Sequence, residues 1–244
     1  MALFFHSMKY ALQLEERVEA TPKSTGVCPC CGSEMIAKCG NRKVWHWAHK
    51  TKQTCDHWWE SETQWHREWK NRFPHDWQEV IHLADSGEKH IADVKTPDGL
   101  VIEFQHSYIS SEERLYREKF YSNMIWIVDG RRTKNDLKRL VKLHEDARTP
   151  PWYYWREGNE IKIYDPEWYL PKAWLTSRVK VYFDFGYIDR PGDYEDGCIA
   201  PPWNSHLVCL NPESAIDNYR RSLQVIDRTR FLTDLTSRYN DAPF

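Results

Sequence analysis

The chain has 244 residues, 41% hydrophobic and 14% aromatic, so it is long enough for one or two domains with packed cores. Its formal net charge of -2 and pI near 6.6 exclude a globally basic nucleic-acid coat, so any contact with DNA or RNA must come from local patches. No stretch approaches the roughly 18 apolar residues that a membrane span needs, and Leu3-Phe4-Phe5 is too short for a signal-peptide core, so we expect a cytoplasmic protein without membrane partners.

The first predicted element is a strand that begins at Met8 (MKYALQL), which leaves residues 1–7 as an upstream extension. A polar linker follows and ends in TPKSTG, where Pro and Gly indicate irregular backbone. All close cysteine and histidine spacings lie in residues 26–57. The chain has seven cysteines, an odd number, which fits metal ligation in a reducing compartment better than a disulfide framework. We therefore predict a small zinc-binding module in residues 1–57.

The spacing of Cys28 and Cys31 is that of a zinc knuckle, because two thiolates separated by two residues reach one tetrahedral ion from a tight turn. Three further candidates follow at plausible distances: His46, His49 and Cys55. A four-coordinate site has room for only two of these three. We favour His49 with Cys55, because along the strand VWHWAH the side chain of His46 points away from that of His49. A twist or a bulge in this strand would still bring in both histidines.

The alternative is a set of free buried cysteines, which is the usual interpretation of a lone cysteine. We interpret Cys30, which lies between two ligands in the sequence, and Cys39 as bystanders of the metal site. Zinc would supply much of the stability of so small a module, on the order of 10 kcal/mol. We expect a structural Zn²⁺ that positions the module or its contact with a substrate, and not a catalytic ion.

Residues 58–73 are predicted to form a helix that ends before Pro74, because large apolar side chains recur at helical spacing. The stripe consists of Trp58, Trp65, Trp69 and Phe73. On a helical wheel Glu62 and His66 fall inside this stripe, with Lys70 at its edge. Polar groups in an apolar arc need partners, so these residues either satisfy one another at intervals of four or act at a metal.

Period-two patterns then predict strands over residues 77–83, 90–96 and 100–105, with the turns DSGEK and PDG between them. A capping box that begins at Ser110 predicts a helix to about Ser122, and the apolar run MIWIV (124–128) predicts a last strand. Because this strand follows a crossover helix, we expect it to lie parallel to its neighbour. The order is helix, three strands, helix, strand, which predicts an α/β domain with a mixed sheet over residues 58–148.

Two carboxylates flank the PDG turn at equal distances, so Asp93 and Glu103 are predicted to lie opposite one another across a hairpin. Glu103 and Gln105 leave one face of their strand, while Phe104 points to the other. Two acidic groups on rigid strands can hold Mg²⁺ or Mn²⁺, which activates water and neutralises charge on a phosphate.

The alternative is that Asp93 merely ends a strand and that Glu103 sits on a solvent-exposed face. The neighbouring residues argue against it, because IADV and VIEF read as strands covered on both faces. A carboxylate in such a strand is costly unless it is paired or binds a metal.

Beyond this region the sequence is less specific. Residues 131–142 (RRTKNDLKRLVK) carry six Lys or Arg against one Asp, which indicates either a phosphate-binding patch or a solvated helix face. Arg114, Arg117 and Lys119 are further candidates for phosphate contacts. Residues 149–244 form a predicted C-terminal extension rich in aromatic residues and containing strands, of unknown role. Its aromatic side chains either pack in a core, which we favour, or stack on bases.

Taken in order, these motifs resemble the competence protein CoiA and CoiA-like nucleases. The resemblance runs from CPCCGSEMIAKCG through VWHWAH, ETQWHREWK and HIADV to VIEFQHSYIS, and covers roughly residues 8–130. It implies a zinc-ribbon-like module followed by a restriction-endonuclease-like domain with the αβββαβ core of PD-(D/E)xK nucleases. It also implies a link to processing of incoming DNA, with recombination or DNA-processing proteins as partners.

Position by position, the resemblance assigns Asp93 and Glu103 to the family's acidic pair. Gln105 departs from the commoner pattern, in which a lysine stands at this place. The residues that match the family's first-helix pattern are Glu62, His66 and Lys70. Glu79, in the first strand, is a weaker candidate for the same pocket.

The leading hypothesis is a nuclease dependent on Mg²⁺ or Mn²⁺ that hydrolyses DNA. Asp93 and Glu103 would be ligands, Gln105 would orient water or substrate, and Glu62 would be an auxiliary ligand or base. The alternative is a non-cleaving DNA-binding or recombination accessory module on a nuclease-like scaffold. A third hypothesis is a zinc-ribbon adaptor that binds protein.

Overall fold

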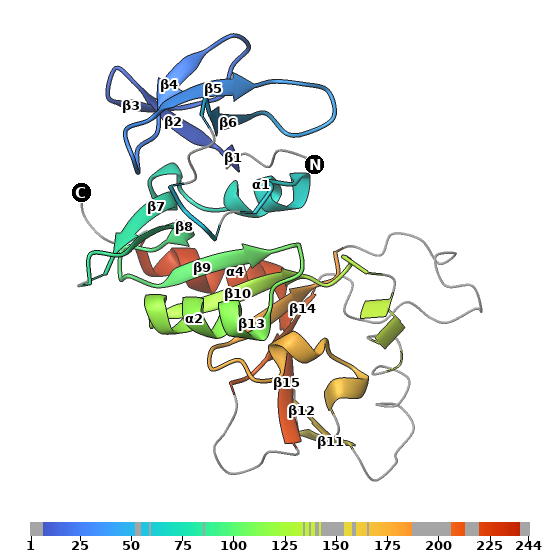
Figure 1. Cartoon of the computed structure of the whole chain (residues 1–244). Helices are drawn as coiled ribbons and strands as arrows, with labels where there is room; N and C mark the ends of the chain where they lie inside the picture. Colours follow the sequence, from blue (N-terminus) through green and yellow to red (C-terminus); the bar gives the residue numbers. More distant parts are fainter. Residues whose placement is uncertain are drawn as a thin grey trace. The chain divides into compact units, whose positions relative to one another are not determined.

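The chain, as a computed structural model, divides into two compact units, Met1–His106 and Ser107–Phe244 (Figure 1). The described residues are 7–51, 55–58, 60–84, 86–133, 135–136, 138–139, 142, 154–157, 160–164, 166–186, 206–212 and 220–239. The predicted boundary after residue 57 lies within the first unit, and the one after residue 148 lies outside the described residues. Within the described part, no helix has the length and apolar character needed to cross a bilayer.

The first unit begins with a six-stranded antiparallel sheet in the order β1-β6-β5-β4-β2-β3 (Figure 1). Its strands are β1 Ser7–Met8, β2 Tyr10–Gln13, β3 Glu16–Glu19, β4 Thr25–Val27, β5 Glu34–Lys38 and β6 His46–His49. Trp47 is fully buried in the core of this sheet with Met8 and Met35. Its indole Nε1 donates to the Val18 carbonyl at 2.9 Å, so the polar end of the ring is satisfied.

Contacts at Gly26 and at Lys9 shape this sheet. A Cβ at Gly26 would lie 3.0 Å from the Cβ of Ala11, so the approach of β4 to β2 requires glycine there. The single strand predicted from Met8 is interrupted at Lys9, whose amide donates to the Glu79 carboxylate at 2.7 Å. The first strand of the prediction is therefore two strands, β1 and β2.

A helix and three antiparallel strands complete the first unit, with the strands in the order β9-β8-β7. The elements are α1 Gln64–Lys70, the 3-10 helix η1 His75–Trp77, β7 Gln78–Leu83, β8 Lys89–Lys95 and β9 Val101–Gln105. Each strand begins and ends within one residue of its prediction. Every side chain of β9 is buried, which confirms that this strand is covered on both faces. Phe104 packs on the rings of Trp69 and Phe73, with centroids 5.9 and 6.3 Å away.

The helix predicted over residues 58–73 is shorter in the structure, since α1 covers only Gln64–Lys70. Thr63 caps its first turn, because its Oγ1 accepts from the His66 amide at 3.2 Å. Trp58, which we assigned to the helical stripe, instead stacks on the ring of His90, with centroids 3.2 Å apart. Glu62 therefore precedes the helix, and its place on the helical wheel was wrong.

The second unit contains a mixed sheet in the order β11-β12-β15-β14-β13-β10. β10 runs parallel to β13, and the other neighbours in this sheet are antiparallel. The elements are α2 Ser111–Tyr121, β10 Met124–Asp129, β11 Tyr154–Glu157, β12 Glu160–Tyr164, η2 Pro166–Trp168, η3 Lys172–Trp174, β13 Val181–Asp184, β14 His206–Leu210, β15 Arg220–Asp227, α4 Arg228–Thr236 and η4 Ser237–Tyr239. The predicted capping box is confirmed, because Ser110 Oγ accepts from the Glu113 amide at 3.1 Å.

Aromatic side chains form much of the core of this unit. Those described as buried in the C-terminal extension are Tyr169, Trp174, Tyr182, Phe183, Phe185 and Phe231. Trp174 packs edge-on against Trp126, with ring centroids 5.4 Å apart. Packing, the interpretation that we favoured for the aromatic residues, is confirmed for these side chains.

Arg114 does not face phosphates, because it is fully buried in the second unit. Its guanidinium donates to the Ala173 carbonyl at 2.7 Å, to Glu118 at 2.5 Å and to Thr176 at 2.7 Å. Arg117 is also buried and pairs with Glu113. The prediction that both arginines contact phosphates was wrong, because each is buried and forms an ion pair with a glutamate one helical turn away. The predicted basic segment 131–142 lies partly outside the described residues.

Candidate functional site

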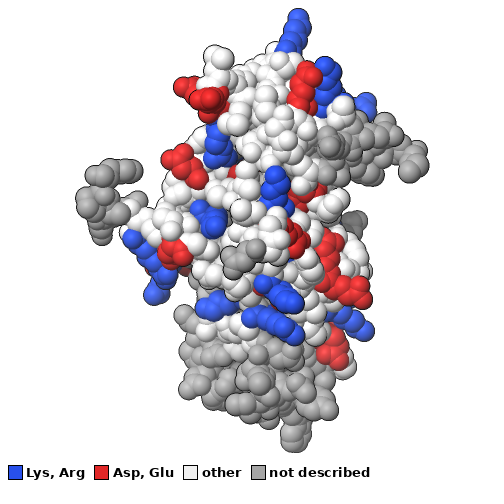
Figure 2. Space-filling model, turned by 60° about the vertical axis from the view of Figure 1, so that its left-hand side comes forward, with Lys and Arg blue, Asp and Glu red and all other residues white. Residues whose placement is uncertain are grey.

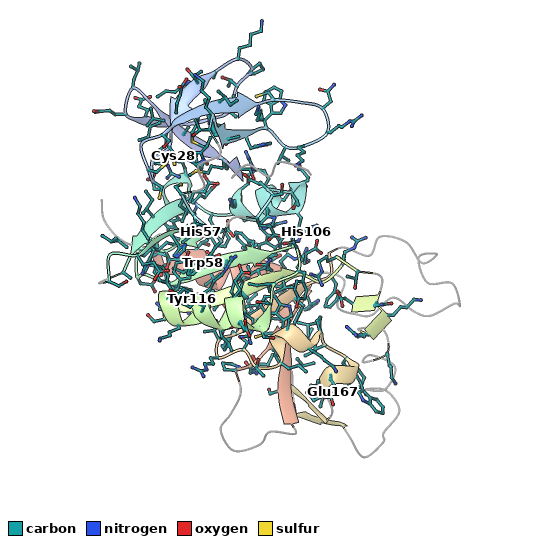
Figure 3. All side chains as sticks on the ribbon, in the orientation of Figure 1. Cys28, His57, Trp58, His106, Tyr116 and Glu167 are labelled. Carbon is teal, nitrogen blue, oxygen red and sulfur yellow. The ribbon has the colours of Figure 1, made fainter. Side chains whose placement is uncertain are left out.

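Four metal-ligand side chains meet at the N-terminal sheet: Cys28, Cys31, His49 and Cys55. Cys28 is labelled in Figure 3. The ligand atoms of the four residues all lie within 4.8 Å of one another. The sulfur atoms of Cys28 and Cys55 are 3.7 Å apart, and Cys31 Sγ is 3.3 Å from His49 Nε2. Two thiolates on one tetrahedral zinc ion stand about 3.8 Å apart, so the donor set fits zinc.

The turn between β4 and β5 positions two of these thiols. The Cys28 amide donates to the Ser33 carbonyl at 2.8 Å, and the Gly32 amide donates to the Cys28 carbonyl at 2.9 Å. Gly32 has a φ of 73°, a left-handed conformation that glycine adopts without strain. His49 is the last residue of β6 and pairs in register with Met35 of β5, which brings its ring to this turn.

The crowded thiols change one another's pKa. The pKa of Cys28 is lowered to about 4, chiefly because Cys55 donates a hydrogen bond to it. The same contact raises the pKa of Cys55. A metal binds cysteine as the thiolate, so each of the two would be a ligand only after it has lost its proton.

The pair that we favoured, His49 with Cys55, is the one that the structure brings to the two thiols of the knuckle. His46 lies outside the cluster, because its Nδ1 is 2.8 Å from the Val44 carbonyl at the start of the strand. Neither a twist nor a bulge brings both histidines together. Cys30 and Cys39 are also outside the cluster, as predicted for bystanders of the metal site.

A carboxylate beside Cys55 joins the metal loop to β8. Asp56 Oδ1 accepts from His90 Nδ1 at 2.7 Å and from the Trp58 amide at 2.9 Å, and its Oδ2 accepts from the Ile91 amide at 2.8 Å. Burial raises the pKa of Asp56, but the hydrogen bonds outweigh it, so that the pKa lies below its usual value. No feature of the sequence pointed to this link, since its partners are separated by more than thirty residues.

The predicted carboxylate pair lies together on the β8–β9 hairpin. The register of Val94 with Ile102 places Asp93 opposite Glu103. Glu103 Oε1 accepts from the Asp93 amide at 3.2 Å, and Asp93 Oδ2 accepts from the Phe104 amide at 3.0 Å. Glu103 is 5% exposed and the side chain of Asp93 is 21% exposed, so Asp93 is the member of the pair that solvent reaches.

Lys70 brings a positive charge to this pair. Its Nζ is 3.1 Å from Asp93 Oδ1, 3.0 Å from Glu79 Oε1 and 3.8 Å from Glu62 Oε1. Burial lowers the pKa of Lys70, but the three carboxylates outweigh burial and raise the pKa well above its ordinary value. Lys70 is therefore a permanent cation at the end of α1.

Glu79 ties this cation to the N-terminal sheet. Its Oε1 accepts from the Lys9 amide at 2.7 Å and its Oε2 accepts from the Tyr10 amide at 3.0 Å. Burial raises the pKa of Glu79, but Lys70 and the two amides outweigh it and lower the pKa. The φ of Glu79 is 47°, a conformation that costs a residue with a side chain about 1–3 kcal/mol. Glu79 was only a weak candidate in the sequence, because its partner Lys9 is 70 residues away.

Glu62 contributes a buried oxygen to the same cluster. Its Oε1 accepts from Arg67 Nε at 2.8 Å, whereas its Oε2 has no hydrogen-bond partner among the described residues. A buried carboxylate oxygen without a donor is costly, so a donor or a cation that arrives there is bound favourably. Arg67, which no sequence signal singled out, also donates to the Trp45 carbonyl at 2.9 Å.

His66 supports the strand that carries Glu103 and Gln105. Its Nε2 donates to the Phe104 carbonyl at 2.8 Å and lies 3.4 Å from Glu60 Oε2. Burial lowers the pKa of His66, but the contacts with Glu60 and the nearby carboxylates outweigh it, so the pKa is raised. Gln105 is 4% exposed, two residues after Glu103 on β9.

The predicted catalytic residues therefore lie around one hairpin and one helix of the first unit. Among the described residues, the cysteine and histidine cluster is the only group that brings three or more metal-ligand atoms within 4.8 Å. The hairpin offers an ion two carboxylates, Asp93 and Glu103, with Lys70 beside them.

Fold and site define the chain as a mixed α/β protein in which an antiparallel sheet carries a Cys₃His metal-ligand cluster. Residues 12–57 match the family model of the competence protein CoiA, N-terminal domain. This match includes all four ligands of the cluster and ends before the β8–β9 hairpin. Neither a comparison with curated proteins nor one with solved structures gives a match.

Proposed function

We propose that the chain is a divalent-metal-dependent nuclease that hydrolyses DNA phosphodiester bonds. The contact of Lys70 with Asp93, beside Glu103, is the observation that carries this proposal. The element order α1, β7, β8, β9, α2, β10 supports a restriction-endonuclease-like core, and the match of residues 12–57 supports kinship with CoiA proteins.

The carboxylates fit Mg²⁺ or Mn²⁺. These ions prefer oxygen ligands and are commonly held by one or two carboxylates together with phosphates of the substrate. Asp93 and Glu103 would hold the ion, and the buried Oε2 of Glu62 would serve as an auxiliary ligand or base. When bound, the ion neutralises charge on the phosphate and lowers the pKa of water.

The protein's own groups supply the rest of the chemistry. Gln105 is a neutral amide, so it orients water or phosphate by hydrogen bonds but adds no charge. Lys70 supplies the positive charge that a lysine at position 105 gives in the commoner pattern, and Glu79 keeps it in place. His66 holds the Phe104 carbonyl and thereby the strand between Glu103 and Gln105.

The Cys₃His cluster is proposed to hold a structural Zn²⁺. All four positions are filled by protein ligands, which leaves no open position for a substrate or a reacting water. Its role is to stabilise the N-terminal sheet and the loops that leave it.

A second candidate function is DNA binding without cleavage. The observation that favours it is that the hairpin carboxylates already have partners inside the protein: the Phe104 amide and Lys70 for Asp93, and the Asp93 amide for Glu103. Carboxylates that already have a cation or a backbone donor as partner do not require an ion for their stability. The two functions differ in whether DNA is cut, so one assay separates them.

The test is a panel of end-labelled single-stranded, duplex and branched DNAs incubated with zinc-loaded protein, with and without added Mg²⁺ or Mn²⁺. We expect cleavage of at least one DNA that requires the added ion and is lost in Glu103→Ala, while Glu68→Ala, an exposed acid on α1, cleaves like the wild type. DNA that is bound by both proteins and cut by neither establishes the non-cleaving function instead.

A further inference from the structure

The loop that joins β5 to β6, which Figure 1 shows between these two strands, has a basic and aromatic sequence. We call the last residue of β5 together with this loop loop 38–45; it reads KCGNRKVW, with three cations and no acid. The cations are exposed, and Trp45 is 46% exposed. On the face drawn in Figure 2, Lys and Arg are interspersed with Asp and Glu, in keeping with the net charge of -2. A segment with one sign of charge is therefore a local feature of this loop.

Two contacts hold this loop beside the candidate site. Arg67 donates through Nη2 to the Trp45 carbonyl at 2.9 Å and through Nε to Glu62 at 2.8 Å. Lys43 Nζ donates to the Ser61 hydroxyl at 3.4 Å, one residue before Glu62. Arg67 thus connects the backbone of the loop to Glu62, whose Oε2 has no hydrogen-bond donor among the described residues.

The base of the same hairpin is fixed by the metal cluster. Lys38 pairs in register with His46, and three residues further along β6 stands the ligand His49. Arg67 therefore holds the last residue of the loop, and the strand that follows the loop carries the candidate ligand His49. An anchored loop loses little conformational entropy when it binds a ligand.

We propose that loop 38–45 binds the single-stranded DNA segment that leads into the candidate site. Its cations complement phosphates, and Trp45 offers a flat ring on which an unpaired base stacks. A base in a duplex is already stacked on both faces, so the exposed ring favours a single strand. The inference rests on the proposed nuclease function and deepens it, because it gives the N-terminal module a contact with the substrate.

The test is equilibrium binding of a fluorescent single-stranded oligonucleotide, followed by anisotropy without added divalent ions, so that binding is read without cleavage. Trp45→Ala should weaken binding about tenfold and Trp45→Phe should restore most of it, because stacking needs an aromatic ring. Arg42→Ala with Lys43→Ala should reduce the slope of log K against log salt by about 1.4, the share of two phosphate contacts on a single strand. The control is Lys50→Ala, an exposed lysine of the same hairpin that pairs with Glu34 at 2.9 Å.

The outcomes separate this inference from the nuclease proposal. Binding that depends on Trp45, by a protein that cuts no DNA, supports the loop and contradicts the nuclease. Unchanged binding by the loop variants, in a protein that does cut, overturns the loop alone. Equal affinity for a duplex of the same sequence, with no effect of Trp45→Ala, also overturns it. Zinc content and thermal unfolding of each variant establish that the fold is intact.

Discussion

Lys70 is a buried cation whose partners are carboxylates from three different segments. Lys70→Met should lower the free energy of unfolding by about 3–5 kcal/mol, because it leaves Glu79 and Asp93 without a compensating charge. Urea unfolding followed by circular dichroism measures this loss. Lys50→Met, at an exposed ion pair, should change stability by less than about 1 kcal/mol. Similar effects of the two substitutions would contradict the assigned network.

The ionisation of Glu79 should make the free energy of unfolding depend on pH. Its pKa is lower in the folded chain than the ordinary value of 4.5, so its stabilising effect is complete at neutral pH and is lost as pH falls through the folded pKa. Wild type should therefore exceed Glu79→Gln in stability at neutral pH, and the difference should shrink once pH falls below about 4.5. Urea unfolding of both proteins over a pH series measures it. A difference that stays constant into acid would mean that Glu79 is not an ionised partner of Lys70.

Among the helices and strands, the sequence predicted correctly those features that depend on residues close together in the chain. The hairpin that carries Asp93 and Glu103 was predicted within a residue, since period-two patterning and the PDG turn fix its register. The start of α1 was wrong, because the spacing of Trp58 matched a helix by coincidence and its ring packs on His90 instead. Periodicity reports which residues are apolar, and here a capping threonine decided where the helix begins.

The two candidate clusters differ in how much of each the sequence reveals. The four metal ligands lie within 28 residues, so the knuckle spacing and strand alternation were enough to choose among them. The network around Lys70 joins α1 to β7, β8 and the first strands. One of its hydrogen bonds, from Lys9 to Glu79, joins residues that are 70 positions apart in the sequence. Pairings at such separations depend on tertiary packing, so the clamp that Glu79 forms on Lys9 and Tyr10 had no sequence signal.

The Cys₃His cluster should govern the stability of the N-terminal sheet. Cys28→Ser should lose the roughly one zinc ion per chain that we expect, together with much of the sheet, because metal binding and folding are coupled in such modules. The matched control is Cys39→Ser, a thiol outside the cluster, which should keep both. Elemental analysis and thermal unfolding distinguish the two variants. Zinc that is retained by Cys28→Ser, or absent from folded wild type, would refute the site.

At the scale of the whole molecule, the first unit holds both candidate sites, and three contacts run between their neighbourhoods. Asp56 joins the metal loop to β8, Glu79 joins β7 to the N-terminal strands, and Arg67 joins α1 to the β5–β6 loop. The N-terminal sheet and the hairpin with Asp93 are thus parts of one compact unit. The proposed zinc site and the proposed nuclease site share these contacts, so we expect disruption of either one to impair the other.

We propose that DNA is cut at the cluster of Asp93, Glu103 and Lys70. The most direct measurement is the single-turnover rate of cleavage with added Mn²⁺ for wild type, Asp93→Asn and Asp76→Asn, the last an aspartate whose side chain is 95% exposed. Asp93→Asn keeps the shape of the side chain but removes its negative charge, with which Lys70 pairs and which would bind the ion. We therefore expect the cleavage rate to fall by at least about 10²-fold. Asp76→Asn should cut at the wild-type rate. Equal rates for all three proteins, or no cleavage by wild type on any DNA, would contradict the claim.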